Sequence, residues 1–213
     1  MVKGVIFDLD GVLVSTDELH YEAWKAMADR EGIYFDREIN QRLRGVSRMD
    51  SLEIILERAE RDYSQEEKDE LAAYKNGLYV TLLDTLTEAD VLPGVTELLS
   101  ALEERNVLLA VGSSSKNAKK ILEKTVLTNR FRAIADGTDI TRSKPDPEVF
   151  LCAAKKLGLA PADCAVVEDA QAGIEAACAG GMLACAIGDA CGSDKADIRL
   201  DGISELMEKL ERS

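Results

Sequence analysis

The sequence predicts an α/β fold, in which a Rossmann-like parallel sheet core carries an inserted all-helical unit. Short apolar runs alternate with stretches of helical period, which is typical of a parallel sheet with crossover helices. Residues 17–83 differ, because long amphipathic segments follow one another there without a strand run between them. We therefore predict two domains: a core from residues 1–15 and 88–213, and a helical insert from residues 16–87.

The predicted strands are four short apolar runs. The first, GVIF at residues 4–7, is rich in β-branched and aromatic side chains and stops at Asp8, as a buried parallel strand does. The others are VLLAVG, CAVVE and LACAI, at residues 107–112, 164–168 and 183–187. Side chains that directly follow these runs are therefore expected at the carboxyl edge of the sheet.

Capping residues mark the ends of several predicted helices. Asp146 and Pro147 precede the pattern EVFLCAAKKL as an N-cap and a first helical residue, and Gly158 follows its end. In the insert, Ser64 and Glu67 have the spacing of a capping box.

Composition limits the partners of the protein. The 213 residues include 40 acidic and 26 basic side chains, and the resulting formal charge of −14 repels nucleic acid and anionic membranes. A small anionic substrate is still compatible, because local cations can reverse the potential inside one cleft. The amino-terminal segment lacks the pattern of a signal peptide or a membrane span, and the five cysteines include no CxxC pair. We expect a cytoplasmic monomer without a zinc or disulfide framework.

The candidate chemistry begins with Asp8 and Asp10, which follow the first predicted strand. At this spacing both can point toward one metal or phosphoryl group, although the pair alone favours a solvated turn or a helix cap. Ser113, Lys144 and the pair at 168–169 also follow predicted strands or lie in loops beside them. Because ligands of open α/β sheets bind along the carboxyl edge, we expect these segments to converge there.

Together these residues have the chemistry that phosphoryl transfer requires. Asp8 is the candidate nucleophile, and Asp10 is the general acid/base that protonates the leaving oxygen. Glu168 and Asp169 provide hard oxygen ligands for Mg²⁺, while the lysine and the serine stabilise the charge of the transferred group. Each has a structural alternative, such as a solvated lysine, a strand-to-helix turn, or serines that cap a helix beginning near Lys116. Their joint placement at strand ends favours catalysis.

These motifs carry a family resemblance. The segment FDLDGVL, Ser113 in VGSSS, Lys144 in SKPDP and the segment VVEDAQAGIEAA resemble the four motifs of the haloacid dehalogenase superfamily. The helical insert is similar to the class I cap of that superfamily. The resemblance implies an aspartyl phosphate on Asp8 and a bound Mg²⁺ ion. The implied metal ligands are Asp8, the carbonyl of Asp10, Glu168 and Asp169.

Residues of the insert narrow the resemblance to the phosphosugar mutases of the superfamily. The segments RGVSRMDSLEIIL and YKNGLY, together with His20 and Trp24, are similar to those enzymes. The implied reaction interconverts β-glucose 1-phosphate and glucose 6-phosphate through β-glucose 1,6-bisphosphate. The implied substrate-binding residues are Thr16, His20, Trp24, Gly45, Val46, Arg48, Ser51, Lys75, Ser113, Ser114, Ser115, Lys116, Asn117 and Lys144.

Arg48 is the residue that distinguishes this reaction. A mutase must bind a second, non-reacting phosphate of its substrate, and an arginine fork suits that task. The structural alternative is a surface arginine in the first turn of a helix. For His20, the only histidine, the sequence alone favours a packing or capping role.

Two other functions are compatible with parts of this pattern. A phosphomonoester hydrolase acting on a small sugar phosphate would use the same core residues and differ in whether water or a sugar hydroxyl is the acceptor. A non-catalytic, receiver-like module phosphorylated on Asp8 would need neither Asp10 nor a large helical insert. Both are present, which argues against the receiver-like module. The residues of the insert favour the phosphosugar mutase over the hydrolase, whereas the core residues do not separate the two.

Overall fold

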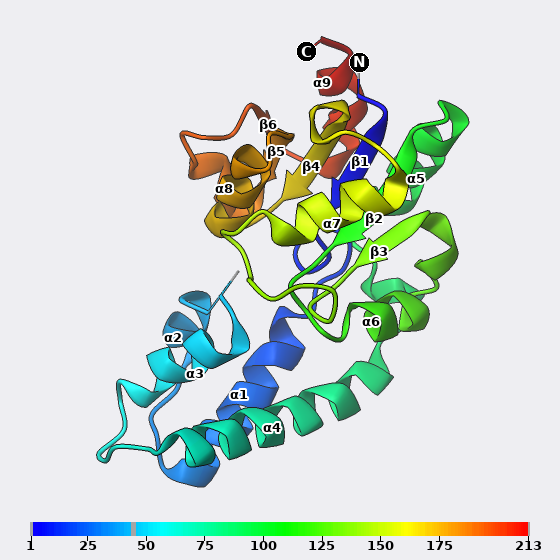
Figure 1. Cartoon of the computed structure of the whole chain (residues 1–213). Helices are drawn as coiled ribbons and strands as arrows, with labels where there is room; N and C mark the ends of the chain where they lie inside the picture. Colours follow the sequence, from blue (N-terminus) through cyan, green and yellow to red (C-terminus); the bar gives the residue numbers. More distant parts are fainter. Residues whose placement is uncertain (1, 44–45, 213) are drawn as a thin grey trace. The chain divides into compact units, whose positions relative to one another are not determined.

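The structure is a computed structural model in which residues 2–43 and 46–212 are described (Figure 1). Contacts between Cα atoms divide the chain into two compact units: a core unit, Met1–Ser15 with Thr87–Ser213, and a cap unit, Thr16–Leu86. A helix long and apolar enough to cross a bilayer does not occur among the described residues.

The described part of the core unit contains one sheet of six parallel strands, in the order β3-β2-β1-β4-β5-β6. The strands are β1 (Gly4–Phe7), β2 (Leu108–Gly112), β3 (Ala133–Ala135), β4 (Cys164–Glu168), β5 (Leu183–Ile187) and β6 (Ile198–Leu200). The predicted parallel α/β class is confirmed. The sequence pattern does not predict the edge strands β3 and β6, because runs of three residues are too short to show a period.

The central strand β1 lies between β2 and β4. Phe7 is in register with Val111 on one side and with Val167 on the other. The chain adds β2 and β3 on the first side and β4, β5 and β6 on the second, so the strand order reverses between β1 and β4. Open α/β sheets bind their ligands at the carboxyl end of such a reversal point.

Helices cover both faces of the sheet. Helices α7 (Glu148–Leu157) and α8 (Gln171–Ala179) pack on one face (Figure 1). Small buried side chains such as Ala153 and Ala177 allow close approach there. Helix α5 (Val95–Glu104) packs against β2 on the other face, and α9 (Leu206–Arg212) packs against α5. Helix α6 (Ala118–Lys124) follows β2.

The ends of α7 agree with the predicted capping signals within one residue. The assigned helix begins at Glu148, whose N–H donates to Oδ1 of Asp146 at 3.0 Å. It ends at Leu157, and its C-cap residue Gly158 has a left-handed φ of 73°. The predicted C-terminal glycine therefore has the expected role, whereas the N-cap is Pro147, one residue after the predicted Asp146.

The cap unit contains four α-helices among its described residues, and these enclose a separate apolar cluster. They are α1 (Asp17–Glu31), α2 (Arg37–Gln41), α3 (Arg48–Leu56) and α4 (Gln65–Leu82). Met27, Leu52 and Ile55 are among the buried side chains of this cluster. The predicted capping box is confirmed at the start of α4, where the N–H of Ser64 donates to Glu67 at 2.8 Å and the N–H of Glu67 donates to Ser64 at 3.3 Å.

Short 3-10 helices complete the described structure. They are η1 (Leu83–Thr85), η2 (Glu88–Asp90), η3 (Thr128–Arg130), η4 (Pro161–Asp163), η5 (Gly188–Gly192) and η6 (Ile203–Glu205). Within the core unit, an antiparallel bridge joins Val14 to Val91, and the N–H of Leu92 donates to the carbonyl of Leu13 at 2.9 Å. The two segments of the core unit that precede and follow the cap unit in the sequence are thus paired with each other.

Candidate active site

Three neighbouring strands place polar side chains at their carboxyl ends. Asp8 follows β1, Ser113 follows β2, and Glu168 is the last residue of β4. The N–H of Asp8 donates to the carbonyl of Val167 at 2.9 Å, which places Asp8 beside Glu168. Asp8 is 7% exposed and Glu168 is 1% exposed. The predicted convergence of these segments is therefore present in the fold.

Lys144 joins the two carboxylates. It lies in the loop between β3 and α7, and its Nζ donates to Asp8 Oδ1 at 2.5 Å and to Glu168 Oε2 at 2.7 Å. The ammonium group also lies 4.7 Å from the ring centroid of Phe150. Both ion pairs are buried, so the solvated-lysine alternative does not describe Lys144.

The site holds more negative than positive charge. Burial raises the pKa of Asp8 well above its ordinary value; Lys144 opposes this, and the charges of Glu168, Asp169 and Asp10 raise the pKa further. For Lys144, burial alone would lower the pKa, but the charges of Asp8 and Glu168 and its hydrogen bonds to them raise it above its ordinary value. One lysine therefore faces four carboxylates, and an additional cation would stabilise the cluster.

The carboxylates can hold a metal ion. One oxygen each from Asp8, Glu168 and Asp169 lies within 4.8 Å of the others. Carboxylate oxygens are the ligands that hard divalent cations prefer. The donor set and the excess of negative charge therefore both fit a divalent cation.

Two glycines allow the acidic side chains to approach the backbone closely. Gly11 has a φ of +80°, and a Cβ atom there would lie 2.0 Å from Asp169 Oδ2. In α8, a Cβ atom at Gly173 would lie 1.9 Å from Glu168 Oε2. Glu168 Oε1 accepts the N–H groups of Asp169 at 3.2 Å and Ala170 at 3.1 Å. Sequence reasoning did not identify either glycine as a site residue, although both stand inside the acidic motifs.

Residues 113–117 form a turn-rich segment after β2, which we call the 113–117 loop. The hydroxyl oxygen of Ser113 accepts the N–H of Ser115 at 3.1 Å, and the hydroxyl oxygen of Ser115 accepts the N–H of Asn117 at 3.2 Å. The hydroxyl of Ser114 is buried without a hydrogen-bond partner in the described structure, and Lys116 is exposed. Helix α6 begins at Ala118 without a side-chain cap, so the serines do not cap it.

A second cluster lies in the cap unit, around Lys75. Its Nζ is 2.9 Å from Nδ1 of His20, and it lies 4.7 Å from the ring of Trp24 and 4.6 Å from the ring of Tyr79. The hydroxyl of Tyr79 donates to the hydroxyl oxygen of Thr16 at 3.2 Å. Burial, and then the charges of Lys75 and Arg48, lower the pKa of His20 well below its ordinary value. Sequence reasoning missed Tyr79, although it closes the quoted segment YKNGLY.

The remaining predicted cap residues lie at the start of α3. Arg48 is the first residue of this helix and is half-buried, and burial lowers its pKa. Ser51, one turn later, is 3% exposed, whereas Val46 before the helix is 37% exposed. Gly45 lies outside the described residues. Arg48 thus stands in the first helical turn, as the structural alternative expected, but it is partly desolvated.

Comparisons with known proteins agree with this arrangement. Residues 2–181 match the sequence profile of the haloacid dehalogenase-like hydrolases. The chain is 45% identical over 211 residues to a β-phosphoglucomutase of Bacillus subtilis. The alignment covers 98% of this chain and 93% of that relative. It is 30% identical to a phosphorylated carbohydrates phosphatase of Thermotoga maritima, over 85% of this chain and 82% of that protein. A crystal structure of β-phosphoglucomutase from Clostridium difficile matches with a TM-score of 0.92 and 39% identity, covering 100% of this chain and 96% of that chain.

Proposed function

The chain belongs to the haloacid dehalogenase-like hydrolase family, and we propose that it acts as a Mg²⁺-dependent β-phosphoglucomutase. The reaction would interconvert β-D-glucose 1-phosphate and glucose 6-phosphate through an aspartyl phosphate on Asp8 and β-glucose 1,6-bisphosphate. The observation that carries this proposal is the 45% identity to a β-phosphoglucomutase, because it extends over 98% of the chain and so includes the cap unit as well as the core. 

In the proposed reaction, Asp8 attacks a phosphoryl group of the substrate. The bond from Lys144 at 2.5 Å orients the carboxylate and keeps a positive charge next to the transferred group. Ser113, which lies at the end of the neighbouring strand, would donate its hydroxyl proton to a phosphoryl oxygen. Positioning and charge stabilisation are the main contributions that a protein makes to phosphoryl transfer.

Mg²⁺ would be held by Asp8, the carbonyl of Asp10, Glu168 and Asp169. When bound, it would neutralise charge on the phosphoryl oxygens and relieve their repulsion from Asp8. The excess of carboxylates over lysine at the site supports a divalent cation there. Glu168 would keep its two backbone N–H donors, which fix its orientation.

Asp10 would transfer the protons of the reaction. It would protonate the oxygen that leaves the phosphoryl group, and then deprotonate the hydroxyl that attacks the aspartyl phosphate. A mutase uses a sugar hydroxyl as that acceptor, whereas a phosphatase uses water. The core residues are compatible with both acceptors, so the distinction depends on the cap unit.

Cap residues would supply the contacts that favour the sugar. Arg48 would bind the non-reacting phosphate. On the core unit, Ser114, Ser115, Lys116 and Asn117 would contact a substrate phosphate. The sugar would be contacted by Thr16, His20, Trp24, Gly45, Val46, Ser51 and Lys75. The partial desolvation of Arg48 and the buried, charged Lys75 support anion and hydroxyl binding on this unit. 

A sugar-phosphate phosphatase is the second candidate, and one specific observation favours it. The chain is 30% identical to a phosphorylated carbohydrates phosphatase over 85% of its length. Such an enzyme would use the same Asp8 chemistry and release inorganic phosphate.

One assay separates the two functions. The purified protein is incubated with Mg²⁺, β-glucose 1-phosphate and a trace of β-glucose 1,6-bisphosphate, and both glucose 6-phosphate and free phosphate are followed with time. We expect rapid formation of glucose 6-phosphate with little free phosphate. Rapid release of free phosphate without glucose 6-phosphate would instead establish a phosphatase, and the absence of both products would contradict both candidates.

A further inference from the structure

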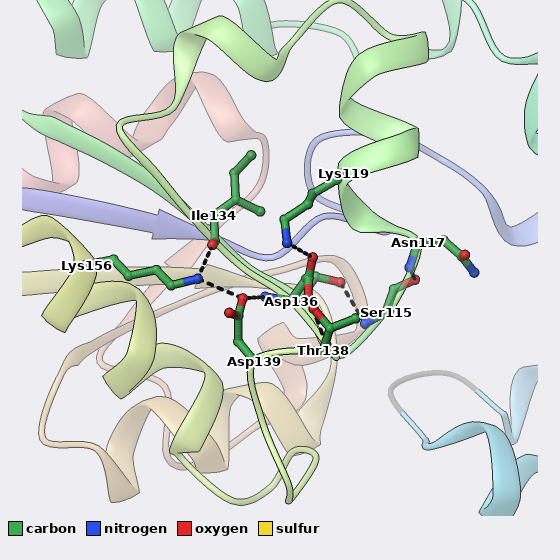
Figure 2. A network of polar contacts seen from close by, with 9 residues as sticks. Ser115, Asn117, Lys119, Ile134, Asp136, Thr138, Asp139 and Lys156 are labelled. Atoms are coloured by element: carbon green, nitrogen blue, oxygen red, sulfur yellow. Dashed lines mark hydrogen bonds and ion pairs between the residues drawn. The ribbon is translucent and has the colours of Figure 1, made fainter.

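A polar network around the buried carboxylate of Asp136 adjoins the 113–117 loop, and the proposed chemistry does not use it. Asp136 follows β3 and is 1% exposed. Its carboxylate accepts the N–H of Thr138 at 2.8 Å and the hydroxyl of Thr138 at 2.5 Å, and it pairs with Lys119 Nζ at 2.9 Å (Figure 2). The pKa of Asp136 is lowered, because these hydrogen bonds outweigh the effect of burial. Asp136 therefore carries its charge at neutral pH.

The backbone of the turn that follows β3 is held by a second pair of side chains. Asp139 Oδ2 accepts the N–H of Asp136 at 3.0 Å. Lys156, on α7, donates to the same Asp139 oxygen at 2.7 Å and to the carbonyl of Ile134 at 2.7 Å. In Figure 2, Lys156 reaches Asp139 from the left of the view, and Lys119 reaches Asp136 from above. Residues 134–139 are consequently bonded to both neighbouring helices.

This turn supports the 113–117 loop directly through backbone contacts. The N–H of Ser113 donates to the carbonyl of Ala135 at 3.0 Å, and the N–H of Gly137 donates to the carbonyl of Ser115 at 3.1 Å. A Cβ atom at Gly137 would lie 2.3 Å from the carbonyl oxygen of Ser114 and 3.0 Å from the backbone nitrogen of Lys116. The two segments are too close for any side chain to fit between them.

Lys119 connects the same turn to the element that follows the loop. It is the second residue of α6, which begins directly after Asn117. The loop is therefore fixed at one end by β2, at the other end by the ion pair between α6 and Asp136, and in the middle by the bond from Gly137. A loop fixed at three points loses little conformational freedom when it binds a ligand.

We propose that Asp136 is a positioning residue, which holds the 113–117 loop in the conformation that binds a substrate phosphate. This inference rests on the proposed function, because that function assigns the loop to phosphate binding. Asp136 would not contact the substrate; it would act through Lys119 and through the turn at Gly137. Preorganisation of this kind lowers the cost of binding, so its loss should appear in substrate affinity before it appears in the chemical step.

The main variant is Asp136→Asn, which keeps the side-chain volume and an oxygen that can accept from Thr138 but loses the ion pair. We expect the KM for β-glucose 1-phosphate to rise about tenfold with a much smaller change in kcat, since charge-assisted hydrogen bonds have effects of this order. Lys119→Met should have the same effect, and the double variant should be no worse than either single one. Lys119→Arg should leave the KM at its wild-type value, because arginine can keep the ion pair with Asp136.

Glu103→Gln is the matched control, because it breaks the ion pair with Arg130 at 2.8 Å in the same unit. Backbone hydrogen exchange gives a direct measure of the loop: the amide proton of Gly137 should exchange faster in Asp136→Asn but not in Glu103→Gln. The positioning role is wrong if Asp136→Asn keeps the wild-type KM and the wild-type exchange rate of the Gly137 amide. A loss of thermal stability alone, like that of the control, would indicate only a structural role.

A titration with inorganic phosphate separates this inference from the proposed function. The amide resonances of the 113–117 loop are followed by NMR in the wild type and in Asp136→Asn. Weaker phosphate binding in the variant, by about the same tenfold factor, supports the positioning role even if the wild type proves not to be a mutase. Equal phosphate affinity in the two proteins overturns it, whatever reaction the enzyme catalyses.

Discussion

The ammonium group of Lys75 lies 2.9 Å from Nδ1 of His20, the only histidine in the chain. A protonated lysine can only donate, so Nδ1 of His20 must accept, and the ring proton is assigned to Nε2. The cation and the burial of the ring both oppose protonation of His20. A histidine with a carboxylate neighbour would instead gain a proton readily.

This pair predicts a specific pH dependence of stability. Because the folded-state pKa of His20 is lowered, the unfolded chain binds a proton below about pH 6.5 that the folded protein does not bind. The free energy of unfolding should therefore fall by about 1.4 kcal/mol per pH unit as the pH drops below that value, through this group alone. Urea denaturation of the wild type and of His20→Gln between about pH 5 and pH 7.5 measures the difference.

The variant Lys75→Met is the control for this effect. Removing the cation should raise the pKa of His20 toward its ordinary value, and the pH dependence should become shallower. Parallel stability curves for the wild type and His20→Gln would show that folding does not lower the pKa of His20.

Arg48 should affect isomerisation more than phosphoryl uptake. Arg48→Ala removes charge-assisted hydrogen bonds to the non-reacting phosphate, and we expect kcat/KM for β-glucose 1-phosphate to fall about a hundredfold. Hydrolysis of acetyl phosphate, which has no second phosphate, should change little. Arg42→Ala is the control, because Arg42 pairs with Glu57 at 2.9 Å on the same unit. Equal losses in both reactions of Arg48→Ala would argue against the assigned role.

The variant Asp8→Asn should form no phosphoenzyme, because an amide cannot replace the carboxylate as a nucleophile. Labelled β-glucose 1,6-bisphosphate, followed by rapid quenching and mass spectrometry, measures the covalent product. Asp163→Asn serves as the control, since Asp163 pairs with Lys3 at 3.1 Å, and it should be labelled like the wild type. A phosphoenzyme in Asp8→Asn would place the nucleophile elsewhere.

Mg²⁺ should stabilise the folded protein through the acidic cluster. At a concentration about 100 times its dissociation constant, a ligand that binds only the folded state adds about 2.7 kcal/mol. We expect the melting temperature to rise with Mg²⁺ in the wild type, to respond far less in Asp169→Asn, and to rise normally in Glu175→Gln, whose carboxylate pairs with Lys195. An unchanged Mg²⁺ response in Asp169→Asn would exclude Asp169 as a ligand.

Two glycine-to-alanine substitutions should have opposite effects. A methyl group at Gly173 would lie 1.9 Å from Glu168 Oε2, so Gly173→Ala must displace this carboxylate. We expect a loss of about 1–3 kcal/mol in stability together with weaker Mg²⁺ binding. Nothing lies within 4 Å of the corresponding position at Gly77 in α4, so Gly77→Ala should add about 0.5–1 kcal/mol. Similar stability changes in the two variants would contradict the close contact at Gly173.

The sequence predicted the parts of the fold that local patterns determine. The four longer strands and the caps of α4 and α7 follow from short apolar runs and from residues such as Ser64 and Asp146. Asp8, Lys144 and Glu168 could be placed together because parallel strand ends share one edge. The functions of these residues, and of the predicted cap residues, stay proposals.

Other features could not be predicted, because they depend on which distant segments of the chain become neighbours. Asp136 follows a strand of only three residues, and its network exists because β3 lies beside β2. The same limit applies to Tyr79, whose contact with Thr16 joins residues 63 positions apart. The periodicity of a short sequence segment does not show which distant residues it will contact.

The bridge between Val14 and Val91 has a consequence for how the chain folds. Pairing these residues in an unfolded chain closes a loop through residues 16–86, and doubling the length of such a loop costs only about 0.6 kcal/mol. A long insertion at this place therefore reduces the free energy of unfolding only slightly. It does delay the pairing of β1 with β2, because contacts distant in sequence form slowly. We expect the local helices of the intervening segment to form first and to shorten the effective separation before the central strand joins the sheet.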